Sequence, residues 1–158
     1  MATDMTDAPA YDFLTTLPDA EDHMRLRREA GMSRFSAEAT RMALKGTIHG
    51  VTVVHADETV GMGRIIGDGG CLFQIVDIVV AVDHRGRGLG KRIMQMLMDF
   101  AHDDLPSGSY ISLIADVPAN LLYEQFGFRE TAPVSLGMAI TTGAERQAAS
   151  PLNPGPTE

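Results

Sequence analysis

The spacing of apolar and polar residues predicts helices and strands that alternate along most of the chain. Short β-branched runs predict strands over residues 11–17, 48–54, 60–66, 71–82, 110–115 and 136–140. Helical spacing between capping and stop residues predicts helices over residues 19–30, 36–45, 88–102 and 118–126. The resulting order, β-α-α-β-β-β-α-β-α-β, predicts an α/β (α+β) fold with a mixed sheet and helices on both faces.

The two ends of the chain differ from its middle. Residues 1–9 are polar, so we expect a flexible leader there, followed by a single domain over residues 10–141. Residues 142–158 contain three prolines and few apolar side chains, which favours a disordered tail.

Charge and composition limit the classes of partner. The net charge is −8 and the isoelectric point is near 5.0, which argues against nucleic acid and mildly favours a cationic substrate. Cys71 is the single cysteine, and no apolar run is long enough to span a membrane, so we expect a cytoplasmic protein. The histidines are scattered without the spacing of metal ligands, so no metal is expected.

The segment between the longest predicted strand and the helix that follows it combines glycines with cations. It reads Arg-Gly-Arg-Gly-Leu-Gly-Lys-Arg over residues 85–92. Free amides at a helix start, accessible glycine backbone and nearby cations are typical of a phosphate site. A magnesium-nucleotide loop would need Ser or Thr at position 92, and the dinucleotide motif would need glycine in place of Lys91.

A third pattern fits this segment and one further along the chain. Residues 85–90 have the spacing Arg/Gln-x-x-Gly-x-Gly/Ala, and residues 119–128 read Ala-Asn-Leu-Leu-Tyr-Glu-Gln-Phe-Gly-Phe. With a strand between them, these motifs resemble the two signatures of the GNAT superfamily of N-acetyltransferases. The resemblance covers residues 48–140. It implies the GNAT acyltransferase fold with a mostly antiparallel sheet, acetyl-CoA as co-substrate, and acetyl transfer to an amine by direct attack in a ternary complex.

The resemblance also implies roles for individual residues. Tyr123 is expected to contact the cofactor and to protonate the departing thiolate. The backbone amides at the end of the strand are expected to bind the pantetheine arm and the thioester carbonyl, which assigns them to Val80, Ala81 and Val82. The remaining cofactor contacts are expected from Arg85, Gly86, Arg87, Gly88, Leu89, Gly90, Lys91 and Asn120.

The general base is left open between three alternatives. Asp77 is the only ionisable residue in the apolar run, and burial there is expected to raise its pKa. Asp116 stands where the family usually has Asn, and it is the rival base or a helix cap. The third alternative is a chain of water molecules without a dedicated base. Arg64 and Asp68 lie near the end of the strand predicted over residues 60–66. They are expected to form an exposed ion pair, and lining of the acceptor pocket is the alternative.

The acceptor predicted from size and charge is a small cationic amine. An aminoglycoside or other amino sugar is favoured by analogy with short family members, which would imply antibiotic resistance; polyamines and arylalkylamines are alternatives. Protein N-termini or lysines are the competing acceptors, and a non-catalytic acyl-CoA-binding module is the competing class. Candidate substrate residues are Arg34, Phe35, Asp77, Asp116 and Met138. The resemblance further implies a homodimer.

Overall fold

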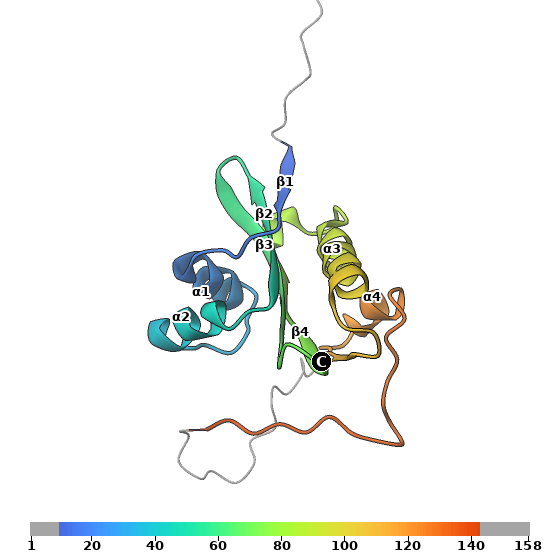
Figure 1. The fold of residues 1–158 in the computed structure, drawn as a ribbon. Coiled ribbons are helices and arrows are strands. Elements are labelled where there is room, and N and C mark those ends of the chain that lie inside the picture. The colour runs from blue at the N-terminus through green and yellow to red at the C-terminus, as the bar shows by residue number, and fades with distance from the viewer. Residues whose placement is uncertain (1–9, 143–158) are drawn as a thin grey trace, which may run out of the picture.

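A five-stranded sheet lies at the centre of the computed structural model, which describes residues 10–142 (Figure 1). The strands follow one another in space as they do in sequence: β1 (Tyr11–Leu14), β2 (His49–His55), β3 (Glu58–Gly67), β4 (Leu72–Val80) and β5 (Tyr110–Ser112). Neighbouring strands are antiparallel except β4 and β5, which are parallel. The predicted mixed, mostly antiparallel sheet is confirmed.

Helices cover both faces of this sheet, as the order of elements predicts. Helices α1 (Ala20–Glu29) and α2 (Ala37–Lys45) lie on one face, and α3 (Leu89–Asp104) and α4 (Asn120–Glu124) on the other (Figure 1). The predicted caps of the first two helices are present: Asp19 accepts from the amide of Asp22 at 2.8 Å, and Ser36 accepts from that of Ala39 at 3.1 Å.

A separate hydrophobic cluster fills each face of the sheet. Ile93 and Leu97 of α3 are fully buried against β2, β3 and β4. On the opposite face, Leu26 of α1 packs with Met62 and Val79. Strand β4 is therefore covered on both sides, which explains its nearly continuous run of apolar residues.

A β-bulge interrupts the pairing of β3 with β4. Gly63 of β3 faces two residues of β4, Asp77 and Ile78. Asp77 has φ of 57°, in the left-handed region that Asp tolerates better than most residues. The extra residue bends β4 in the half of the strand that leads toward α3.

Strands β4 and β5 pair only at their beginnings. The parallel register runs from Leu72 to Gln74 of β4, opposite Tyr110 to Ser112. Beyond Gln74, β4 continues to Val80 with no partner on its β5 side among residues 10–142. The two strands thus separate toward the carboxyl end of β4 and leave backbone groups of that strand unpaired.

The strand predicted over residues 136–140 is wrong. Residues 129–142 form no strand, although apolar residues alternate with small ones over the predicted segment 136–140. A hydrogen-bonded turn, in which the amide of Ser135 donates to the carbonyl of Thr131 at 3.0 Å, redirects the chain before it can add to the sheet. A strand needs a neighbouring edge as well as an alternating pattern.

The other predicted elements form with different ends, and β3 and α3 are longer than predicted. The last predicted helix shortens to residues 120–124, and the preceding strand to residues 110–112. The predicted leader and nearly all of the predicted tail lie outside the described residues. Within the described part of the chain, no helix combines the length and apolarity needed to cross a bilayer.

Candidate active site

The loop between β4 and α3 presents unpaired backbone amides at the start of a 16-residue helix. Gly88 precedes the first residue of α3 with φ of 78°, a conformation that glycine adopts without steric cost, and no side chain caps the helix. Within residues 10–142, the amides of Gly86, Gly88 and Gly90 make no hydrogen bond to protein. These groups and the positive end of the helix dipole form a site suited to an anion.

The cations of this loop differ in what they contact. The Nε group of Arg85 donates to the carbonyl of Val80 at 3.0 Å, so this side chain fixes the loop against the end of β4. Arg87 and Lys91 are exposed beside the unpaired amides. They add positive charge to a surface that already offers hydrogen-bond donors.

The backbone at the end of β4 corrects one expectation. The amide of Ala81 donates to the carbonyl of Val60 at 2.8 Å, so the prediction of a free amide at Ala81 is wrong. Backbone groups alternate in direction along a strand, and the amide of Val80 therefore points away from β3, into the gap where β4 and β5 separate.

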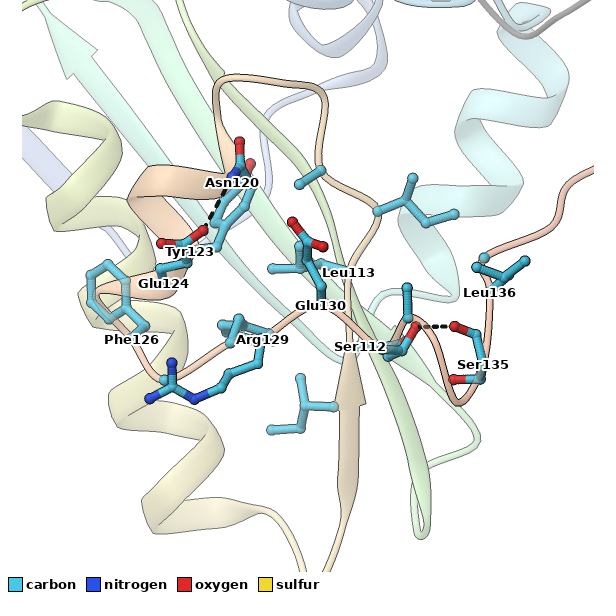
Figure 2. Close-up of a pocket in the computed structure, with 18 of the residues that line it drawn as sticks. Ser112, Leu113, Asn120, Tyr123, Glu124, Phe126, Arg129, Glu130, Ser135 and Leu136 are labelled. Carbon is cyan, nitrogen blue, oxygen red and sulfur yellow. Dashed lines mark hydrogen bonds between the residues drawn. The ribbon is translucent and has the colours of Figure 1, made fainter.

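Tyr123 of α4 lines a large open cavity on the α3–α4 face. The cavity has a volume of about 640 Å³ and lies between β5, α4 and residues 126–137 (Figure 2). Burial, together with the negative charge of Asp116, raises the pKa of the half-buried Tyr123 above its ordinary value. The phenol therefore stays protonated at neutral pH and can donate a proton.

Polar and charged side chains beside Tyr123 determine which ligands this cavity favours. The Nδ2 group of Asn120 donates to Glu124 at 3.1 Å, whereas its Oδ1 atom is buried without a partner among the described residues. Glu130 also lines the cavity, and Figure 2 shows its side chain directed toward α4. The charged side chains of the lining are the carboxylates of Glu124 and Glu130 and the guanidinium of Arg129, so the cavity combines the Tyr123 phenol with a net negative charge that favours a cationic ligand.

Asp77 lies in a buried ionic network on the α1 side of the sheet. Its Oδ2 atom is 2.7 Å from Nε2 of His23 and 2.8 Å from Nε of Arg64, and its Oδ1 atom accepts from Arg27. Burial alone would raise the pKa of Asp77, but the His23 hydrogen bond and the charges of Arg64 and Arg27 hold it well below its usual range. The predicted rise in pKa is wrong.

Arg64 is also paired differently from the sequence prediction. Besides Asp77, it donates to the hydroxyl of Thr47 at 2.6 Å and to the carbonyl of Ala43 at 3.2 Å. Asp68 instead accepts hydrogen bonds from the amides of its own turn. The predicted exposed pair between Arg64 and Asp68 is therefore wrong, since Arg64 is buried and Asp68 caps a loop.

The remaining candidate substrate residues do not meet Tyr123. Arg34 and Phe35 line a separate cavity of about 150 Å³ beside α1, and the Arg27 guanidinium lies 4.7 Å above the Phe35 ring. Met138 is exposed and does not line the cavity that contains Tyr123. Among residues 10–142, no three histidine, cysteine or carboxylate side chains are grouped as metal ligands would be.

Comparison with known families gives the deciding observation. Residues 19–140 match the family described as acetyltransferase (GNAT) domain. The chain belongs to the GNAT family of acetyltransferases. It is therefore an acyltransferase, and the resemblance drawn from the two motifs is confirmed.

Solved structures of other proteins share the fold over most of their length. Protein SA2161 of meticillin-resistant Staphylococcus aureus, a protein of unknown function, is 42% identical, with a TM-score of 0.79 over 84% of this chain and 99% of that one. Glucosamine-6-phosphate N-acetyltransferase of Arabidopsis thaliana is 18% identical, with a TM-score of 0.63 over 84% and 99%. Arabidopsis thaliana NAA60, solved with a bisubstrate analogue, is 19% identical, with a TM-score of 0.62 over 76% and 84%. No curated protein matches.

GNAT enzymes use acetyl-CoA, and the residues present fit this substrate. The pyrophosphate of coenzyme A requires unpaired donors and positive charge, which the loop at residues 85–91 offers. Its amide-containing arm requires an extended strand with unpaired backbone groups, which the end of β4 offers. The unpartnered Oδ1 atom of Asn120 supplies a further hydrogen-bond acceptor.

Sequence reasoning missed the partners of Asp77 in this GNAT enzyme. No pattern singled out His23 or Arg27, and Arg64 was expected to pair with Asp68 instead. A signal was available for two of them, because His23 and Arg27 are four residues apart and share the face of α1 that buries Leu26. Charged residues on an apolar helix face indicate a buried partner.

Proposed function

We propose that this GNAT enzyme transfers the acetyl group of acetyl-CoA to a primary amine of a small cationic molecule, with an amino sugar as first choice. The observation that carries the proposal is the position of Tyr123 in the wall of a cavity whose charged lining, Glu124, Glu130 and Arg129, is negative on balance. A proton donor serves the leaving thiolate, and the carboxylates attract an ammonium group.

The loop after β4 supplies the cofactor side of the proposed site. Arg87 and Lys91, with the free amides of Gly86, Gly88 and Gly90, bind the pyrophosphate, while Arg85 holds the loop in place. The amides of Val80 and Val82 are assigned to the pantetheine arm and the thioester oxygen. Oriented amides of this kind typically contribute about 2.7–4 kcal/mol each to transition-state stabilisation.

The proposed reaction is one direct substitution at the thioester carbonyl. The acceptor first loses one proton from its ammonium group to solvent, because the pKa of an alkylammonium is about 10.4. Its nitrogen then attacks the carbonyl carbon; the C–N bond forms, the C–S bond breaks, and Tyr123 donates its proton to the sulfur. The second proton of the amine returns to Tyr123 through water, which restores the phenol.

Asp77 and Asp116 take different roles in this proposal. Three donors already engage the Asp77 carboxylate and lower its pKa, so it positions the β4 bulge and accepts no proton from substrate. Asp116 is exposed and its charge reaches Tyr123, which suits it to bind the ammonium group together with Glu130. Proton removal from the acceptor is then left to water.

A panel of amines tests the acceptor class. The purified chain is incubated with acetyl-CoA and amino sugars, polyamines, arylalkylamines or short peptides, and free thiol is measured. We expect turnover with a small cationic amine, and Glu130→Gln to raise the KM for that amine while leaving the KM for acetyl-CoA unchanged. Glu38→Gln, an exposed change on α2, is the matched control. If only the peptides are acetylated, the acceptor is a protein amine and the proposal of a small cationic amine is wrong.

A further inference from the structure

The segment between β4 and α3 is held by few hydrogen bonds. In the described part of the chain, two side-chain hydrogen bonds hold residues 82–91, one made by Arg85 and one by His84. A Cβ atom added at Gly86 or Gly88 would meet nothing within 4 Å, so the space beside both glycines is open. A glycine-rich segment of this kind has many accessible conformations, and binding a phosphate selects among them.

The two hydrogen bonds differ in reach. The bond from Arg85 to the carbonyl of Val80 spans five positions, so it ties the segment only to the strand that leads into it. The hydroxyl of Tyr11 is hydrogen-bonded to Nδ1 of His84 at 2.9 Å, across 73 positions of sequence. This second bond connects the residue directly before the loop at residues 85–91 to β1, at the far edge of the sheet from β5 (Figure 1).

Aromatic packing fixes the ring of Tyr11. Tyr11 lies opposite His55 in the register of β1 and β2, and the two rings stack with their centroids 4.4 Å apart. The ring of His84 meets both of them edge-on, with its centroid 5.7 Å from that of Tyr11 and 5.1 Å from that of His55. All three side chains are partly buried. The hydroxyl therefore already has its position, and little side-chain entropy is lost when it bonds His84.

Ring packing alone does not require the polar atoms of this pair. A phenylalanine at position 11 would stack on His55 equally well, so the hydroxyl serves only the bond to His84. Because the pair is only partly buried, water competes for both groups and the net gain in folding stability is small. The bond instead restricts the conformations of the loop before a ligand arrives, and preorganisation of this kind raises affinity.

We propose that Tyr11 and His84 are positioning residues for the cofactor, and that their hydrogen bond holds the start of the loop at residues 85–91 in the conformation that receives the pyrophosphate of coenzyme A. This inference rests on the proposed function, which assigns the pyrophosphate to that loop. Neither side chain needs to touch the cofactor, because the pair acts through the backbone of the residues that follow His84.

Calorimetric titration with coenzyme A tests the positioning role. Tyr11→Phe keeps the stacked ring and removes the hydroxyl, and it should raise the Kd for coenzyme A about two- to tenfold. His84→Leu removes the other partner. The double variant should bind no more weakly than His84→Leu alone, since both changes remove one and the same bond. His84→Asn restores a group that can bond the hydroxyl and should recover part of the affinity.

His49→Leu is the matched control. His49 stacks on Phe100 of α3 with centroids 3.9 Å apart, at the opposite end of β2 from His55. Its loss removes an aromatic pair of the same kind without touching the segment before α3. The Kd for coenzyme A should therefore stay unchanged in His49→Leu, whatever this variant loses in urea unfolding.

The outcomes separate this inference from the function on which it rests. If the wild type binds coenzyme A and Tyr11→Phe binds it equally well, the positioning role is wrong and the proposed function stands. Additive effects of the two substitutions, or an equal loss of affinity in His49→Leu, would also overturn the positioning role. A wild-type chain that does not bind coenzyme A would overturn the proposed function, and this inference with it.

Discussion

The guanidinium of Arg64 and the carboxylate of Asp77 form a buried ion pair across the β3–β4 bulge, with Nε 2.8 Å from Oδ2. Arg64 is 6% exposed and Asp77 is 7% exposed, so solvent screens the pair little. Arg27 and His23 of α1 contact the same carboxylate and tie that helix to the bulge. The bulge precedes the segment of β4 that we assign to binding the thioester. The network, on the α1 side of the sheet, therefore holds this segment in place.

Removing the carboxylate should destabilise the protein strongly. Asp77→Ala leaves the charges of Arg27 and Arg64 buried without their anion, and breaking such a pair typically costs about 3–5 kcal/mol. Urea unfolding followed by circular dichroism measures the loss. Asp83→Ala, in the exposed turn after β4, is the matched control and should change the free energy of unfolding by less than about 0.5 kcal/mol. A small effect at Asp77 would mean that the network is dispensable.

The same carboxylate should make stability depend on pH. The pKa of Asp77 in the folded protein lies well below the value of about 3.9 in an unfolded chain. The ionised form therefore stabilises the fold above pH 3.9, and this contribution is lost as the pH falls toward the folded pKa. We expect the free energy of unfolding to fall more steeply below pH 4 in the wild type than in Asp77→Asn. Parallel curves for the two proteins would contradict the assignment.

Loss of the Tyr123 hydroxyl should affect chemistry more than binding. Tyr123→Phe removes the proton that we assign to the thiolate and should lower kcat by about 10²–10⁴. The KM for acetyl-CoA should change little, because we assign most of the cofactor binding to the loop at residues 85–91. Steady-state kinetics measure both parameters, and calorimetric titration with coenzyme A checks that affinity is retained. Unchanged kcat would remove the general-acid role.

Alanine at Gly88 should weaken cofactor binding. The left-handed conformation of Gly88 costs an L-residue about 1–2 kcal/mol, so the loop would relax and misplace its amides. Gly108→Ala introduces the same strain, at φ of 86°, in the loop after α3. We expect both variants to lose similar stability and only Gly88→Ala to lose affinity for coenzyme A. Equal affinity in the two variants would exclude the loop as the phosphate site.

A methyl group at Gly63 should disturb the packing opposite the bulge. A Cβ atom there would lie 2.6 Å from Ile93 and 2.7 Å from Ile78, which forces these side chains to move. Overpacking of this kind costs about 1–3 kcal/mol. Gly46→Ala, whose nearest neighbour would be 3.7 Å away, should cost less than Gly63→Ala in urea unfolding. A larger cost for Gly46→Ala than for Gly63→Ala would show that the side chains beside α3 repack around the methyl group with little loss of stability.

Most elements of the fold could be predicted because their causes are local. Asp19 and Ser36 cap the helices that they were expected to cap, and the glycines at residues 86–90 lie at the strand-to-helix turn. The alternating pattern of residues 136–140 was also recognised as strand-like. It failed as a prediction because strand formation requires an edge, and the chain's own turn at residues 131–135 leads away from one.

The sequence by itself determined the order of helices and strands, the loop that suits a phosphate, and the position of Tyr123 in a motif of the GNAT family, since each depends on residues close together in the chain. Only the tertiary structure decided the ionisation of Asp77, the pairing of the Ala81 amide and the exposure of the apolar residues in the segment 136–140. Arg27 meets Asp77 across 50 positions of sequence, and a pKa depends on neighbours in space. Folding sets those neighbours.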